Sequence, residues 1–204
     1  MLLIEHTFFM VTAKNINFKS ITFIFILISF LGWTVEKMFF LIFYGANVDR
    51  GFLTLPFCPI YGFSLVGTYY LLGTPKTFRK RLFVYYENYS DKRLVTEKTA
   101  AVFLYYIFAC LTATFAELTV GFVSKYYFNV LLWDYSVQQF NLCGLICLKF
   151  ALIWGVLITC FMIFIWENLI KFTGRIPKIF ITAANFVIIA AMITDYVICL
   201  VKLF

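Results

Sequence analysis

The chain alternates between long apolar runs and short polar connections. Five runs each supply about the 20 residues that a helix needs to cross a bilayer core. These predicted spans cover residues 20–44, 54–73, 99–123, 142–165 and 179–203. Residues 1–17 are mixed in polarity and too short to span, which indicates an interfacial or cytosolic lead-in. The pattern predicts an all-α fold, a polytopic transmembrane helix bundle of about five spans in a single transmembrane domain over residues 1–204.

The composition excludes a soluble globular protein. Hydrophobic residues make up 63% of the 204 residues and charged residues only 13%, with a mean hydropathy of +0.92. A soluble domain has about 25% charged residues, because its surface must be covered by polar groups. Lipid removes that requirement. Cys143 and Cys147 would share a helix face but lack the further ligands of a zinc site, so we expect no metal and no cofactor.

The basic residues predict the orientation of the bundle. With five spans, the N-terminus and the connections 74–98 and 166–178 lie on one side of the membrane. That side holds twelve Lys and Arg residues and the other side three, namely Arg50, Lys125 and Lys202. Because cytoplasmic connections are enriched in Lys and Arg, the N-terminus is predicted to be cytoplasmic and the C-terminus external. We therefore interpret the net charge of +7 as a topology signal and not as a nucleic-acid surface.

Four predicted helices carry a charged residue well inside an apolar run: Glu36, Glu117, Lys149 and Asp195. Such a charge costs about 2.5–3.5 kcal/mol at the membrane centre and usually marks a binding site or a pathway. At about 1.5 Å of rise per residue, all four lie on the order of 10 Å below the outer surface, and Tyr61 lies at a similar depth. We expect a shared polar pocket there, although Asp195 has the alternative of pairing near the C-terminus. The competing interpretation is a structural ion pair between Lys149 and one carboxylate.

The predicted external connections add three polar candidates. Arg50 is the only cation of the first connection. Asp134 lies in the second, and Asn141 opens the predicted fourth helix, so Asn141 is either an N-cap or a member of the site. The predicted substrate-binding residues are therefore Glu36, Arg50, Tyr61, Glu117, Asp134, Asn141 and Lys149.

Several short motifs occur in a fixed order along the chain. They are Gly32-Trp-Thr-Val-Glu36, Arg50-Gly-Phe-Leu, Cys58-Pro-Ile-Tyr-Gly62, the turn from Thr114 to Glu117, Trp133-Asp-Tyr-Ser136, Phe140-Asn141 and Trp154-Gly155. Together they resemble a bacterial membrane family named putative ABC-transporter type IV, or putative ABC transporter permease (CmpB-like), over residues 25–178. The resemblance implies a transport role for a multi-pass protein of the bacterial cell membrane.

Three functions stay open from the sequence. The first is a transport component that holds a solute in the outer pocket. The chain has no P-loop, so an ATP-driven version requires a separate ATPase subunit, and five spans are few for a carrier, which favours a homo-oligomer.

The second is an intramembrane enzyme acting on a lipid-linked or head-group substrate at the outer leaflet. In that case Glu36, Glu117 and Asp134 would divide the acid–base roles and Arg50 would hold a phosphate. The third is an accessory membrane protein whose charges lock the bundle. Membrane lipid is an expected partner and nucleic acid is not.

Overall fold

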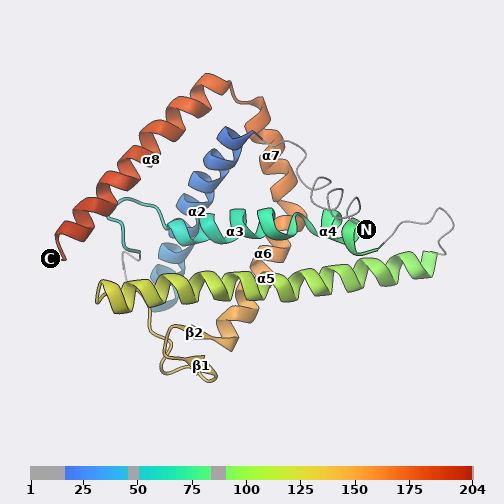
Figure 1. Cartoon of the computed structure of the whole chain (residues 1–204), viewed down its shortest axis with the longest axis horizontal. Helices are drawn as coiled ribbons and strands as arrows, with labels where there is room; N and C mark the ends of the chain where they lie inside the picture. The colour runs from blue at the N-terminus through green and yellow to red at the C-terminus, as the bar shows by residue number, and fades with distance from the viewer. Residues whose placement is uncertain (1–16, 46–50, 84–90, 204) are drawn as a thin grey trace, which may run out of the picture.

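The structure is a computed structural model that describes residues 17–45, 51–83 and 91–203. Its helices are α2 (Phe18–Tyr44), α3 (Pro59–Leu72), α4 (Pro75–Leu82), α5 (Asp91–Tyr127), α6 (Leu148–Phe164), α7 (Trp166–Arg175) and α8 (Lys178–Val201). One small hairpin, β1 (Asn141–Leu142) and β2 (Ile146–Cys147), interrupts them between α5 and α6 (Figure 1). The all-α prediction is confirmed, and the hairpin is the one departure from it in the described residues.

Three helices are long and apolar enough to cross a membrane on their own: α2, residues Leu94–Tyr127 of α5, and α8. Helices α6 and α7 form a fourth candidate, bent by 50°, if the pair is counted as one span. Helix α3 has 14 residues, so at about 1.5 Å per residue it is shorter than a hydrocarbon core of about 30 Å. Apolar membrane helices are thus confirmed, while the count of about five spans and the orientation stay predictions.

The predicted second span, 54–73, becomes helical only at Pro59. Proline suits the first turn of a helix, where its missing N–H is not needed. The preceding residues 51–58 are not helical, and the Cys58 N–H donates to the Ser29 carbonyl of α2 at 3.0 Å. Non-helical backbone at membrane depth requires such protein partners, because lipid offers none.

The predicted fourth span, 142–165, begins later than expected, because α6 starts at Leu148. The residues before it form the hairpin, whose turn places Cys143 and Gly144 at φ angles of 55° and 71°. Positive φ at both central residues is what the tightest hairpin turns require. A short apolar run alone does not distinguish a strand from a helix. Lys149 is consequently the second residue of its helix and not a residue one or two turns inside it.

The polar connections also differ from expectation. The predicted connection 74–98 contains α4 and the start of α5, and the predicted connection 166–178 contains α7. Thr74 caps α4 with a reciprocal bond to Thr77, which explains a helix in so basic a segment. Lys76 of α4 pairs with Glu167 of α7 at 3.1 Å, so these two short helices are joined at the same end of the molecule.

The core lies where α2 to α7 meet, while α8 lies at the periphery against α2 (Figure 1). Trp166 and Tyr105 are fully buried in it, and the Tyr105 hydroxyl donates to the Gly73 carbonyl at 2.8 Å. Helices α5 and α6 approach so closely that a Cβ at Gly155 would overlap the Cys110 sulfur. This close packing fixes the spacing of the elements that carry the polar residues.

Candidate functional site

Glu117 is the buried acid in the middle of the bundle. It lies on α5, and only 7% of its surface is exposed. Its Oε1 accepts two hydrogen bonds, from the Trp154 indole N–H of α6 at 2.8 Å and from the Tyr135 hydroxyl at 3.1 Å. Its Oε2 is also buried and has no hydrogen-bond partner within the described residues. One oxygen of this carboxylate therefore has two donors, and the other has none within the described residues.

Glu36 is the second acid of this region, half-buried on α2. Its Oε2 accepts a hydrogen bond from the Tyr61 hydroxyl of α3 at 2.9 Å. The Tyr61 ring meets the Trp154 ring edge-on, with centroids 5.7 Å apart. The two carboxylates are thus linked through one pair of aromatic rings that come from α3 and α6. We call Glu36, Tyr61, Glu117, Tyr135 and Trp154 the acidic–aromatic cluster.

Gly32 places Tyr61 in this cluster. A Cβ at Gly32 would overlap the Tyr61 ring, so the absence of a side chain allows α3 to approach α2 at this level. Glu36 follows Gly32 by one helical turn and therefore shares its face. The short motif from Gly32 to Glu36 thus supplies both the space for the tyrosine and the acceptor for its hydroxyl.

Tyr135 lies outside the helices, in the connection between α5 and the hairpin. Its backbone N–H donates to the Gly144 carbonyl at 2.8 Å, and its ring stacks on Phe150 with centroids 4.9 Å apart. Burial raises the pKa of Tyr135, and the nearby Glu117 carboxylate raises it further. The phenol therefore stays protonated at neutral pH and acts as a fixed donor to Glu117.

Asp134 and Asn141 organise the same connection. The Asp134 carboxylate is exposed and accepts the Ser136 N–H at 2.8 Å, which lowers the pKa of Asp134. The Asn141 amide donates to the carbonyls of Ser136 and Gln138, at 3.1 and 2.7 Å. The predicted N-cap at Asn141 is wrong, because α6 starts seven residues further on, after Cys147. The structure uses both polar side chains to shape the turn beside Tyr135.

The remaining predicted residues lie elsewhere or outside the described ranges. Lys149 is exposed, and its ammonium lies 5.8 Å from the Phe150 ring centroid. It does not bond to Glu117 Oε2. Arg50 lies outside the described residues. Asp195 is buried on α8 and accepts hydrogen bonds from the Thr54 hydroxyl and from the Leu55 N–H, the latter at 2.9 Å. Asp195 therefore anchors the non-helical segment 51–58.

Sequence reasoning missed the two donors of Glu117. In the sequence, Trp154 and Tyr135 stand out only as parts of short motifs, and not as partners of an acid. The usable signal is that an indole N–H or a phenol in apolar surroundings needs an acceptor. In the described residues no group of three or more His, Cys, Asp or Glu side chains is arranged to hold a metal ion.

Comparison with known proteins gives one match. The model of the family described as Putative ABC-transporter type IV matches residues 23–200. No curated protein and no solved structure matches the chain. Because the family model covers most of its length, this chain belongs to that family, and its apolar helices fit membrane insertion.

Proposed function

We propose that this member of the family is the membrane-embedded, substrate-binding component of a transporter, and that the acidic–aromatic cluster holds a cationic group of the substrate. The observation that carries the proposal is the buried Oε2 of Glu117, which lacks a partner within the described residues while Oε1 has two. A carboxylate held this way is oriented but not neutralised by its neighbours.

The energetics favour a cation as the missing partner. An unpaired buried carboxylate is costly, and an ammonium group or a proton relieves that cost. The faces of Trp and Tyr rings attract cations, by about 0.5–2 kcal/mol per ring depending on desolvation. Trp154 and Tyr135 both donate to Glu117. Tyr61 packs edge-on against Trp154 and donates to Glu36, a second acid of the same cluster. Acids among aromatic rings are a chemistry that recognises an organic ammonium group.

An ATP-driven transporter needs a second protein, because this chain carries no P-loop. We place the docking surface of a separate ATPase on α4 and α7, at the end that the charge count predicts to be cytoplasmic. The ion pair between Lys76 and Glu167 supports this placement, since it joins both helices into one unit. The family description supports the existence of such a partner.

Ligand titration of the purified protein tests the binding site. Small ammonium compounds, ethylammonium and tetramethylammonium, are added in detergent, and tryptophan fluorescence reports on Trp154. Neutral isosteres of each compound serve as ligand controls. We expect a saturable change with the ammonium compounds only. Trp154→Phe should remove most of the signal.

Two acid variants make the titration specific. Glu117→Gln keeps an acceptor for Trp154 and Tyr135 but removes the charge, so it should abolish the ammonium response. Glu167→Gln removes an acid at the far end of the bundle and should leave the response unchanged. The proposal fails if neutral and charged compounds give the same response, or if Glu117→Gln binds as well as the wild type.

A further inference from the structure

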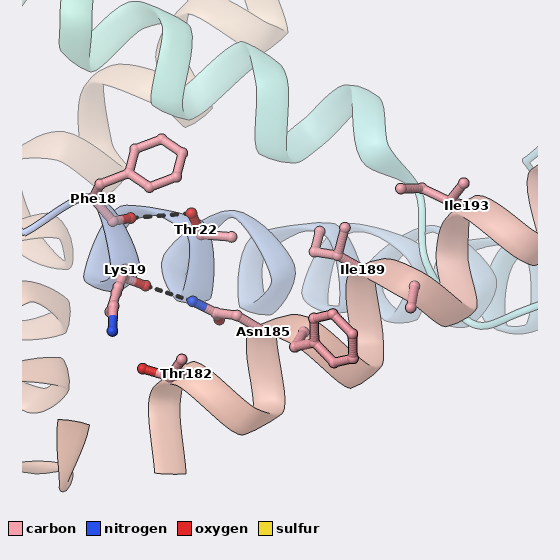
Figure 2. Close-up of a pocket in the computed structure, with 9 residues that line it drawn as sticks. Phe18, Lys19, Thr22, Thr182, Asn185, Ile189 and Ile193 are labelled. Carbon is pink, nitrogen blue, oxygen red and sulfur yellow. Dashed lines mark hydrogen bonds between the residues drawn. The ribbon is translucent and has the colours of Figure 1, made fainter. Parts of the chain in front are cut away.

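A groove of about 440 Å³ lies between α2 and α8, on a part of the molecule that the acidic–aromatic cluster does not use. Figure 2 shows its two different ends. Lys19, Thr182 and Asn185 lie at one end, near the start of both helices. Ile189 and Ile193 of α8 continue the groove as an apolar wall. The groove is therefore amphipathic along its length.

Asn185 lines the groove and joins its two helices. Its Nδ2 donates to the backbone carbonyl of Lys19 at 2.8 Å, which joins α8 to the first turn of α2. Its Oδ1 is buried and has no hydrogen-bond partner within the described residues. Rotating the amide would place the oxygen against the Lys19 carbonyl, so the bond fixes the orientation of the amide.

The polar end is also cationic. Lys19 is exposed in the first turn of α2, and Lys178 is exposed one turn before Thr182 on α8. The lining residues include no acid, so nothing in the groove neutralises the Lys19 ammonium. A polar and cationic end followed by an apolar wall matches one ligand chemistry closely, because a phospholipid combines a phosphate, a head group and an acyl chain in this order.

We propose that this groove binds one anionic phospholipid. The phosphate faces the Lys19 ammonium, and the rest of the head group lies at the same end of the groove, beside Thr182. An acyl chain lies along Ile189 and Ile193. Two other occupants fit the groove less well. A soluble anion would leave the apolar wall uncovered. A helix from a second copy of the chain would have to bring an acidic residue to Lys19. The bound lipid links α8 to α2 and so supports a helix that otherwise lies at the periphery.

Native mass spectrometry of the full chain in detergent tests the proposal. The protein is mixed with equal amounts of phosphatidylglycerol and phosphatidylcholine, and retained adducts are counted. We expect one phosphatidylglycerol to be retained in preference to phosphatidylcholine. Lys19→Gln should weaken retention about fivefold, the effect of one lysine near an anionic lipid. Ile189→Trp should remove the adduct by filling the groove.

Lys171→Gln is the matched control, because it removes an exposed lysine of α7 that does not line the groove. It should retain the lipid as the wild type does. In a second measurement, phosphatidylglycerol should raise the unfolding temperature of the wild type and of Lys171→Gln equally, and that of Lys19→Gln by less. The proposal is overturned if Lys19→Gln and Lys171→Gln lose the lipid equally, or if the wild type retains both lipids equally. It is also overturned if the wild type forms a dimer that holds no lipid and Ile189→Trp dissociates this dimer, since a second copy of the chain would then occupy the groove.

Discussion

Two buried acids of this protein, Glu117 and Asp195, differ in how their oxygens are used. Both are 7% exposed and both lie on membrane helices. Each oxygen of Asp195 has a donor from the segment that it anchors, and the Cys199 thiol of α8 donates weakly to Oδ1 at 3.9 Å. Glu117 has two donors on one oxygen and none on the other within the described residues. The number of donors on the acceptor atoms, and not burial, therefore distinguishes the two acids, and we propose that the acid with the unpartnered oxygen is the one that serves a ligand.

The largest effect on stability is expected from removing the Asp195 carboxylate, which anchors the segment 51–58. Asp195→Leu leaves the Leu55 N–H and the Thr54 hydroxyl without an acceptor, so we expect a loss of about 2–4 kcal/mol of folding free energy. Thermal unfolding in detergent measures it. Thr194→Val, which removes a hydroxyl from the exposed side of α8, is the control and should change little. An Asp195→Leu protein as stable as the wild type would contradict the anchoring role.

The next effect is expected at Gly32, whose missing side chain allows Tyr61 to enter the acidic–aromatic cluster. Gly32→Ala introduces a Cβ that overlaps the Tyr61 ring, and overpacking of this kind costs about 1–3 kcal/mol. Ammonium binding should weaken as Tyr61 moves. Gly67→Ala on α3 is the matched control, because a Cβ there meets nothing within 4 Å. If Gly32→Ala leaves both stability and binding unchanged, the close approach of α2 and α3 is not needed.

A smaller effect is expected from removing one donor of Glu117. Tyr135→Phe or Trp154→Phe should each destabilise by about 1 kcal/mol, because one donor remains on the same oxygen. The double variant should lose more folding free energy than the sum of the two single variants, since the Glu117 carboxylate then keeps neither donor. Unfolding midpoints in denaturant give the interaction energy. Strict additivity would show that the two donors do not act on one acceptor.

The smallest effect is expected for Asp134, an exposed acid. The Ser136 N–H lowers the pKa of Asp134 in the folded protein, so the bond contributes above the ordinary carboxyl pKa of about 4 and is lost as the pH falls below it. The wild type should therefore lose slightly more stability on acidification than Asp134→Asn. Unfolding temperatures measured across this range test the sign. A larger acid sensitivity in the variant would contradict it.

The sequence predicts the helices and part of the cluster, for a physical reason. A charge inside an apolar run has few tolerable positions, so Glu36 and Glu117 indicate the interior of the bundle directly. The same reasoning places Lys149 too deep, because the apolar run that contains it begins as a hairpin. A buried strand and a buried helix are equally hydrophobic, so counting helical turns from the start of the run gives the wrong depth.

The roles of the acids could not be predicted from depth. Asp195 lies on an apolar helix like Glu117, but its partners are a hydroxyl and a backbone N–H some 140 residues away. These hydrogen bonds depend on the backbone of the non-helical segment 51–58. The sequence of the predicted span 54–73, an apolar run with two prolines, does not predict that backbone. The unsaturated oxygen of Glu117 likewise depends on where Tyr135 and Trp154 donate, and only the tertiary structure gives that.

We propose that Glu117 serves a ligand while Asp195 stabilises the fold. The most direct test measures, for Glu117→Gln and Asp195→Asn in parallel, the unfolding temperature in detergent and the ability to complement a deletion strain at equal amounts of folded protein. Glu117→Gln should unfold near the wild-type temperature and fail to complement. Asp195→Asn should unfold at a lower temperature and still complement. Full complementation by a stable Glu117→Gln protein would contradict the account.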